Sequence, residues 1–442
     1  MEVWALVMFA VLMVLVMVGY PVAFTLSAVA LSFGATFLGW QFFDLLPLRI
    51  WGIMTNFTLL AVPLFVFMGI VLEKSGLAAR LIESMGLLCG RMRGGLAVSI
   101  VLVGTLLAAS TGVVGATVVA MGVIALPIML RHRYDPALAT GVIAASGTLG
   151  QIIPPSVILI LLGDVIGIAL GELFMAALLP SLMLVALFVM YVLVIGWLRP
   201  ARAPVVDASR VMAGSSSSAG ALIMAVLPPL LLVFAVLGSI FFGIASPTES
   251  AAIGALGALI MAAAGKRLTL RALTDSMRQT LHLTSMVFLI LIGATAFGLV
   301  FRGMGGDVLV EELMRALPGG EWGFLVLSML LIFLLGFFLD FLEICFIVVP
   351  ILAPIALSLG IDPLWFAVLI ALNLQTSFLT PPFGFSLFYL KAAAPPEIRI
   401  QDIYRGAIPF VGLQLLALGA LLAFPQIALW LPALMNRLQG FT

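Results

Sequence analysis

Apolar segments long enough to cross a lipid bilayer recur along the whole chain, and this feature limits the possible folds more than any other. Runs of spanning length occupy residues 3–19, 21–39, 167–197, 220–242 and 407–425. About 20 apolar residues cross a bilayer as a helix. Of all residues, 64% are hydrophobic and only 9% are charged, whereas soluble domains carry roughly 25% charged residues. Because the alternation typical of barrels is missing, the sequence predicts an all-α integral membrane protein.

Composition and motifs disfavour several other classes of protein. A net charge of +1 gives no basic surface for nucleic acid. An ATP-driven pump needs a phosphate-binding loop, but before Gly265-Lys266 the position of the first glycine holds Ile260. Two histidines and two cysteines offer no catalytic or metal cluster, so we expect no enzyme. The cysteines, Cys89 and Cys345, are expected to be structural thiols. The first span lacks a basic front and a cleavage site and is expected to be retained.

Three proline landmarks recur in one gapless register and divide the chain into two similar halves. The pairs are Asp135-Pro136 with Asp362-Pro363, Pro154-Pro155 with Pro381-Pro382, and Pro127 with Pro354. All three share one offset in the numbering (135 to 362, 154 to 381, 127 to 354). A looser match relates Gly19-Tyr20-Pro21 to Ala245-Ser246-Pro247. Each half is therefore predicted to be one structural unit, as in many transporters.

Loop charge indicates that the two halves have opposite orientations. Arginines flank residues 95–130 at positions 91, 93, 131 and 133, whereas the corresponding flanks 318–321 and 358–362 contain no Lys or Arg. Short cytoplasmic loops carry an excess of Lys and Arg. The first flanks are therefore predicted to lie in the cytoplasm and the second outside, which makes the repeats inverted and puts the N-terminus outside. Four arginines do not follow this pattern: Arg49, Arg302, Arg315 and Arg437.

A segment that starts and ends on the same side of the membrane must turn back inside it. Residues 95–130 are too few for two full spans, which need roughly 40 residues, and their middle, Ala109 to Gly115, is polar and glycine-rich. Residues 324–355 are the equivalent segment and turn near Gly336 to Asp340. We predict two re-entrant hairpins, entering from opposite sides and meeting near the midplane, because irregular backbone at membrane depth must be buried or line a wet cavity.

The following span of each half contains adjacent prolines and is predicted to break in the middle of the membrane. Prolines remove backbone donors and force the preceding residue out of the helical region. The spans affected are residues 136–162 and 364–390. A break frees carbonyl oxygens, which together with Ser and Thr hydroxyls are ligands for hard cations such as sodium. A simple proline kink is the alternative, but its repetition beside a polar hairpin in both halves favours function.

These observations give a domain division. The first inverted repeat covers residues 1–198, a cytoplasmic linker 199–219, the second inverted repeat 220–426 and a C-terminal tail 427–442. Residues 266–280 alternate charged and apolar positions, which is typical of an amphipathic helix lying on the membrane.

At these motifs the chain resembles the large membrane subunit of TRAP transporters, the permease of the dicarboxylate and organic-acid family. The resemblance rests on Ala109 to Gly112 with Pro154-Pro155, on Gly336 to Asp340 with Asn373 to Gly384, and on Ala245 to Ser250. It implies an elevator mechanism, Na⁺ bound at two or more sites, a small four-span membrane subunit and a periplasmic substrate-binding protein. It also implies sodium-coupled import of carboxylates across the bacterial inner membrane.

Candidate ligands follow from matching the family motifs residue by residue. The resemblance implies a sodium site at the first hairpin and break and another at the second, and polar residues beside these motifs are candidates for substrate contact. The sodium candidates are Ser110, Thr111, Gly112, Gly150, Ile153, Pro154, Gly336, Ser377 and Thr380. The substrate candidates are Asp340, Asn373, Thr376 and Ser156. Some relatives have a serine where Val113 stands here, which leaves the side-chain ligands of the first site open.

Alternative roles remain for two of the substrate candidates and for the whole protein. Asp340 is an acid at membrane depth, which points to function, although a capping role is the alternative. Asn373 could equally contact substrate or tie two helices together. At the level of function, the alternatives are a stand-alone elevator-type anion:sodium symporter that needs no binding protein, and a channel.

Overall fold

The computed structural model describes residues 1–76, 80–82, 85, 92–111, 114–205, 219–315 and 318–438, and within these ranges all regular elements are helices. Six of the described helices, or seven if a bent pair counts as one span, are long and apolar enough to cross a membrane. The prediction of an all-α membrane protein is confirmed.

The helices of the first repeat are, in chain order, α1 (Glu2–Val18), α2 (Val22–Phe37), η1 (Trp40–Leu45), α3 (Leu46–Met54), η2 (Thr58–Leu60), α4 (Ala61–Lys74), α6 (Gly95–Thr111), α7 (Val114–Arg131), α8 (Pro136–Thr148), η3 (Leu149–Gln151), α9 (Val157–Ile166) and α10 (Leu170–Leu198). The helices of the second are α12 (Ala219–Phe241), α13 (Pro247–Ala264), α14 (Leu270–Gly303), α15 (Gly306–Arg315), α16 (Gly320–Leu335), α17 (Phe341–Glu343), η5 (Ile344–Val348), α18 (Val349–Ser358), α19 (Pro363–Leu379), α20 (Phe385–Ala393), α21 (Ile400–Ala423) and α22 (Gln426–Leu438).

Helix boundaries reproduce the repeat seen in the sequence. Helix α7 and the segment α17–α18 begin and end at the offset that separates the proline landmarks (114 to 341, 131 to 358). Helices α8 and α19 begin at the same offset (136 to 363), and each starts with an aspartate cap, Asp135 or Asp362, followed by proline. A capping carboxylate satisfies free amides of the first turn, and proline suits the first helical position. The same local signals therefore start the same element in both halves.

One side-chain contact lies on the axis that relates the repeats. The Gln375 amide nitrogen lies 3.4 Å from the Thr148 hydroxyl oxygen, and the two residues occupy equivalent positions of the repeats (148 to 375). Equivalent residues can touch each other only where the axis passes between them. The contact therefore locates this axis beside the two broken helices.

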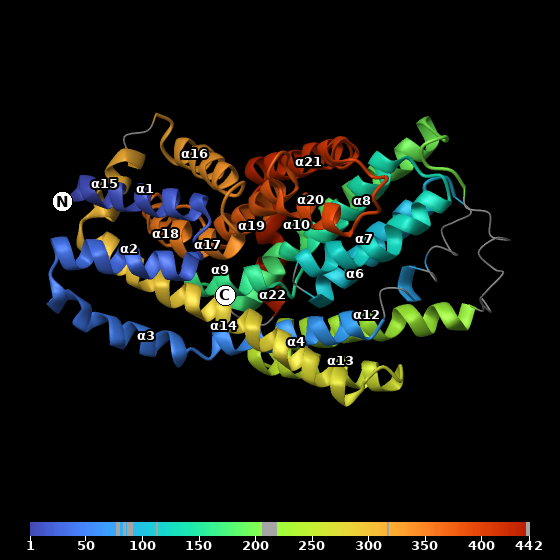
Figure 1. The fold of residues 1–442 in the computed structure, drawn as a ribbon, viewed down its shortest axis with the longest axis horizontal. Helices are drawn as coiled ribbons and strands as arrows, with labels where there is room; N and C mark the ends of the chain where they lie inside the picture. The colour runs from blue at the N-terminus through green and yellow to red at the C-terminus, as the bar shows by residue number, and fades with distance from the viewer. Residues whose placement is uncertain are drawn as a thin grey trace.

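The hairpins α6–α7 and α16–α18 extend from opposite ends of the molecule toward its middle (Figure 1). Helix α8 packs against α6 and α7 of its own hairpin, whereas α9, beyond the break, packs against η5 and α18 of the other hairpin. In the same way, α19 packs on α16, and α20 packs on α7. Each broken helix thus joins both hairpins, which is the arrangement expected of inverted repeats with hairpins on opposite sides.

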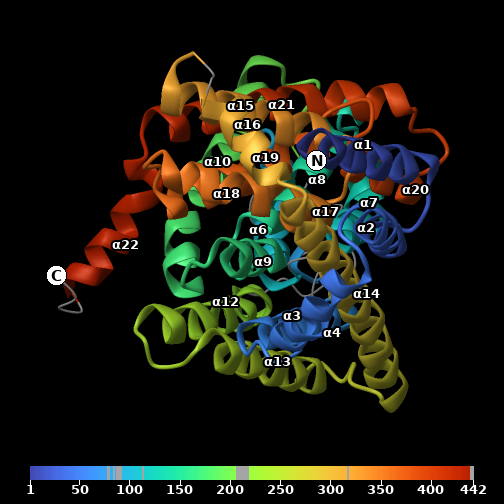
Figure 2. The same cartoon turned by 90° about the vertical axis from the view of Figure 1, so that its left-hand side faces the viewer.

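Helices α3, α4, α12 and α13 form a separate layer along the lower edge of the molecule, with α14 beside them, as Figure 2 shows. The repeats differ here. Helix α14 is continuous over 34 residues, whereas the corresponding part of the first repeat, Trp40–Met54 and Thr58–Lys74, bends by 55°.

Two segments contain more helix than we predict from the sequence. From residue 270 onward, the stretch 266–280 forms the first turns of α14, which continues without interruption to Gly303. That these turns lie on the membrane surface stays a prediction. The tail 427–442 is helical as α22 up to Leu438. Of the linker, the structure describes residues 199–205.

Candidate functional site

The first break is enclosed by protein on all sides. After α8 the chain forms the short helix η3 and a turn, and Ile152 to Pro155 are all buried. The Ser156 hydroxyl, also fully buried, donates a 2.8 Å hydrogen bond to the Gln151 carbonyl and so holds the turn. The carbonyls of Ile152 and Pro154 accept no hydrogen bond from the described residues. Buried carbonyls are normally paired, so unpaired oxygens at membrane depth can coordinate a cation.

Gly150 brings the first break into contact with its own hairpin. A side-chain carbon at Gly150 would lie 3.4 Å from the Ala108 carbonyl oxygen and 3.5 Å from the Ala108 Cα on α6. The predicted ligands Gly150, Ile153 and Pro154 therefore lie beside the end of α6, close to the hairpin turn. Small residues on both sides allow the two backbones to approach each other.

Part of the first predicted site lies outside what the structure describes. The backbones of Ser110 and Thr111 form the last residues of α6, but their side chains are outside the description, and Gly112 and Val113 are outside the described residues altogether. The hydroxyl ligands expected from the first hairpin are therefore not placed.

The second break carries hydroxyl side chains, and one of them, Ser377, stands at the position equivalent to Gly150 of the first break (150 to 377). Thr376, Ser377 and Thr380 donate hydrogen bonds of 2.9, 2.8 and 2.7 Å to the carbonyls of Leu372, Leu374 and Thr376. A hydroxyl that gives its hydrogen to its own helix still has oxygen lone pairs available for another partner. The Pro381 carbonyl accepts no hydrogen bond from the described residues. The second break can therefore offer both hydroxyl and carbonyl oxygens to a cation.

Gly336 and Ser377, which the family resemblance implies for one site, lie next to each other in the structure. Gly336 ends α16, and a side-chain carbon built on it would collide with the Ser377 hydroxyl and lie 2.7 Å from the Ser377 Cβ. Only a residue without a side chain fits here. The turn of the second hairpin therefore rests directly on the polar end of α19.

Asp340 and Asn373 have structural partners. The Asp340 carboxylate accepts a 2.7 Å hydrogen bond from the Phe341 amide, and Glu343 in turn accepts one of 3.1 Å from the Asp340 amide. This capping box starts α17. The Asn373 amide nitrogen donates a 2.6 Å bond to the Met329 carbonyl and ties α19 to α16. In the structure Asp340 thus caps a helix and Asn373 ties two helices together, which are the alternative roles that the sequence left open for them.

The sequence analysis missed a group of buried glutamines near the axis. Gln375 on α19 and Gln414 on α21 both direct their amide nitrogens at Thr148, at 3.4 and 3.5 Å. Their carbonyl oxygens, and both polar atoms of the fully buried Gln151, have no hydrogen-bond partner among the described residues. The sequence did contain a signal for this group, namely glutamines inside apolar spans, because such amide side chains usually bond to other helices.

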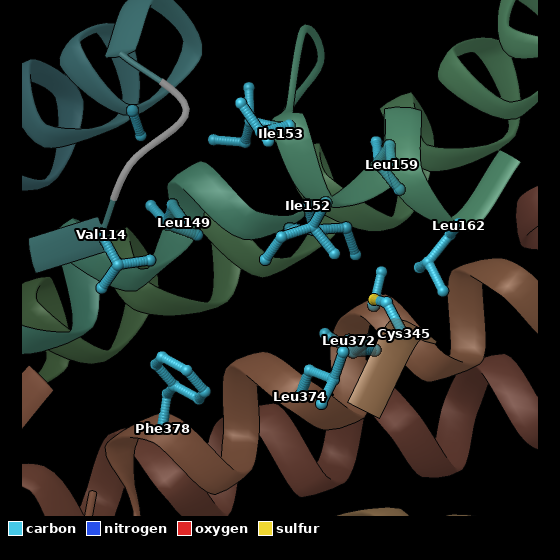
Figure 3. Close-up of a cluster of buried hydrophobic side chains, with 14 of the residues drawn as sticks. Val114, Leu149, Ile152, Ile153, Leu159, Leu162, Cys345, Leu372, Leu374 and Phe378 are labelled. Carbon is cyan, nitrogen blue, oxygen red and sulfur yellow. The ribbon is translucent and has the colours of Figure 1, made fainter. Parts of the chain in front are cut away.

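An apolar cluster lies between the first break and α19. Leu149 and Ile152 of the first break face Leu372, Leu374 and Phe378 of α19, as Figure 3 shows. Cys345 of the second hairpin joins this cluster as a buried free thiol. The cluster packs the two broken helices against each other, and Gln375 adds a polar contact between them, to Thr148.

Comparison with known proteins identifies the family. Residues 9–427 match the model described as the DctM component of the tripartite ATP-independent periplasmic transporters. The chain belongs to this family. It is 30% identical over 432 residues to the sialic acid TRAP transporter large permease protein of Vibrio cholerae, covering 95% of this chain and 96% of the relative. It is also 30% identical over 448 residues to the C4-dicarboxylate TRAP transporter large permease protein of Rhodobacter capsulatus, covering 98% and 99%.

The fold of this TRAP permease is also found among solved transporter structures. The structure of MtrF from Neisseria gonorrhoeae aligns with a TM-score of 0.61 at 13% identity, covering 90% of this chain and 85% of that one. At such low identity the likeness concerns the fold alone. Together with its spanning helices, family membership makes this chain a multi-pass protein of the bacterial inner membrane and one component of a tripartite transporter.

Proposed function

We propose that this TRAP permease imports organic acids by coupling their entry to sodium, with one cation site at each broken helix. The proposal is supported chiefly by the chemistry repeated at the two breaks. Each break holds carbonyl oxygens that accept no hydrogen bond from the described residues, and the second adds the hydroxyls of Ser377 and Thr380. Neutral oxygens of this kind suit sodium, whereas a proton relay would need a chain of titratable groups.

The names of two relatives and the family resemblance support a substrate class. The two relatives described above are named for sialic acid and for C4-dicarboxylates, which are both carboxylates. We propose that this permease also carries a carboxylate, received from a periplasmic binding protein, and that a separate small membrane subunit completes the transporter. Isolation of the protein with its native neighbours from the membrane, followed by mass spectrometry, would identify both partners.

The arrangement of the helices in two layers supports an elevator movement, in which one layer moves against the other during transport. The hairpins and broken helices contact one another extensively, whereas α3, α4, α12 and α13 form a layer of their own (Figure 2). We propose that the first group moves as a block against the second. The Asn56 amide donates a 2.5 Å hydrogen bond to the Asp164 carboxylate, which links the bend between α3 and α4 to the end of α9 and would have to break.

A thermal unfolding experiment tests sodium binding without knowledge of the substrate. The purified protein is unfolded in sodium chloride and in potassium chloride at equal ionic strength. A ligand at a hundred times its dissociation constant stabilises the folded state by about 2.7 kcal/mol, so Tm should rise in sodium and not in potassium. Equal Tm values in both salts, together with uptake that follows a proton gradient, would refute the proposal.

A further inference from the structure

Two of the arginines that do not follow the loop-charge pattern, Arg49 on α3 and Arg302 at the end of α14, line the same cavity. Its volume is about 480 Å³, within the roughly 300–1,000 Å³ typical of small-molecule sites. Asn56 and Thr295 also line it on the side of the α3–α4–α14 layer. Its opposite wall combines the end of α9 with residues of η5 and α18, among them Asp164, Phe346 and Ile351.

The cavity is lined by two arginines and two aspartates, Asp164 and Asp307, and among the described residues these charges are not joined as ion pairs. Neither arginine forms an ion pair with a carboxylate in the part of the chain that the structure describes. The Arg302 Nε donates a 3.2 Å hydrogen bond to the Gly298 carbonyl, which leaves its other guanidinium donors available. Asp164 is occupied by the Asn56 amide, and Asp307 lines the same cavity. Two neighbouring guanidinium groups whose donors are not taken up by the carboxylates of the cavity can bind an anion between them.

We propose that Arg49 and Arg302 form the anion-binding station at which the carboxylate of the transported molecule enters between the two layers. The station rests on the proposed function, since it assigns recognition of the substrate's charge to these two residues. A guanidinium holds a carboxylate through two parallel hydrogen bonds, which an ammonium group cannot do. Both arginines lie on the outer side that the loop-charge pattern predicts, where a periplasmic molecule arrives.

The shape of the cavity favours a small anion over a protein or a lipid headgroup. Its walls come from both layers, and Leu291, Phe297 and Phe301, all buried, supply apolar surface beside the charges. A mixed apolar and cationic lining fits the carbon skeleton and the carboxylate of an organic acid. Because the two walls belong to groups proposed to move against each other, a molecule held here lies in contact with both.

Charged thiol reagents test the station without knowledge of the substrate. In a cysteine-free background, Thr295→Cys places one thiol in the cavity, in nanodiscs of neutral phosphatidylcholine and without any binding protein. The anionic reagent 2-sulfonatoethyl methanethiosulfonate is compared with its cationic trimethylammonium analogue. A cleft that concentrates counter-ions raises association rates by about 10- to 1,000-fold. We therefore expect the anion-to-cation rate ratio to fall at least about tenfold in Arg49→Gln/Arg302→Gln.

Matched variants separate a local charge effect from a general one. Asp307→Asn removes a negative charge from the same cavity and should raise the ratio. Arg315→Gln removes a surface arginine that pairs with Glu311 and should leave the ratio unchanged. The single variants Arg49→Gln and Arg302→Gln serve if the double variant does not fold. An unchanged ratio in folded protein lacking both arginines overturns the station, whereas the sodium-dependent rise in Tm, measured in the same variant, reports separately on the proposed function.

Discussion

The two broken helices have the same arrangement, but the first break is more deeply buried than the second. In the first, every residue from Ile152 to Pro155 is buried. In the second, Pro382 and Phe383 are exposed, and the Pro382 carbonyl accepts a 3.0 Å hydrogen bond from the Tyr404 hydroxyl. If both breaks bind a cation as proposed, the difference predicts that the first site is sealed inside the protein and the second lies at its surface. Access to the second site is then the step that a conformational change can control.

The breaks also differ in how they are attached to their hairpins. In the first repeat, glycines allow close backbone contact: side chains built on Gly104 and Gly147 would collide with Ser146 and Val118. In the second repeat, the residue equivalent to Ser146 is Asn373 (146 to 373), and it reaches across to the Met329 carbonyl. Close packing favours a rigid first site, whereas hydrogen-bonding side chains hold the second.

The largest expected difference between the breaks is their reactivity. In a cysteine-free background, Phe383→Cys should react readily with a small polar methanethiosulfonate. Ile152→Cys should react at least about a hundredfold more slowly, which corresponds to an opening cost of about 2.8 kcal/mol. The rates are followed by mass spectrometry on folded protein, with both variants labelled after denaturation as a control. Similar rates in the folded state would show that the first break is not sealed.

Removing one hydroxyl from the second break should weaken sodium binding. Thr380→Val keeps the side-chain shape and deletes one possible ligand oxygen. A hydrogen bond to a charged group is worth about 1.5–3 kcal/mol, which predicts an apparent sodium affinity about ten- to over a hundredfold lower. Sodium dependence of Tm measures this affinity, and saturating sodium should restore stabilisation because the carbonyls remain.

Thr140→Val is the matched control for this change. Both threonines donate a hydrogen bond to the carbonyl four residues earlier in a broken helix, at 2.8 Å for Thr140 and 2.7 Å for Thr380. Thr140, however, lies in the first turns of α8 and away from the break. Equal sodium affinities for the two variants would remove Thr380 from the site and leave a site built from carbonyls.

Much of this architecture could be predicted from the sequence because its signals are local or repeated. Prolines mark the breaks, aspartates before prolines start α8 and α19, and one constant offset in the numbering (135 to 362) relates the halves. The fit of Gly336 against Ser377 could be proposed only from the family resemblance. The contact joins two elements that are distant in the sequence, and no local pattern records which side chain a hairpin turn will meet.

Other features were ambiguous because one residue type serves two purposes. An aspartate at membrane depth suggests a ligand, but Asp340 also precedes a short helix whose amides need a cap. Arg49 and Arg302 are exceptions to the predicted loop-charge pattern, and the structure shows that both line a cavity, which no local sequence signal records. The bend between α3 and α4 has no counterpart in α14, and it depends on contacts such as Asn56 with Asp164 that only the folded chain creates.

The two hairpin contacts can be exchanged to test whether they are equivalent. Gly336 corresponds to Ala109 and Ser377 to Gly150 (109 to 336, 150 to 377). Gly336→Ala should destabilise the folded protein by about 1–3 kcal/mol, because overpacking forces the hairpin turn away from α19. The double variant Gly336→Ala/Ser377→Gly should recover most of that stability, since it removes the colliding side chain and restores the residue types found at the equivalent positions of the first repeat. Tm in the absence of sodium measures this directly; no recovery would mean that the repeats pack differently.

The smallest predicted effects concern two amides that lie close together on α19. Asn373 makes a short 2.6 Å bond to the Met329 carbonyl, whereas Gln375 makes a long 3.4 Å contact to Thr148 and leaves its carbonyl oxygen without a partner in the described chain. Interhelical hydrogen bonds in membrane proteins average about 0.6 kcal/mol and reach about 1.7. Asn373→Leu should therefore cost about 0.6–1.7 kcal/mol and loosen the second hairpin.

Gln375→Leu is the matched comparison for Asn373→Leu. Replacing a poorly satisfied buried polar group by an apolar one of similar shape is nearly neutral or stabilising, so its Tm should stay at or above that of the unchanged protein. Unfolding midpoints of both variants, without sodium, give the comparison. If Gln375→Leu is the more damaging change, the contact on the axis holds the repeats together and the side-chain tie to the hairpin does not. If Asn373→Leu is the more damaging, the second break depends on a hydrogen bond where the first depends on glycine packing.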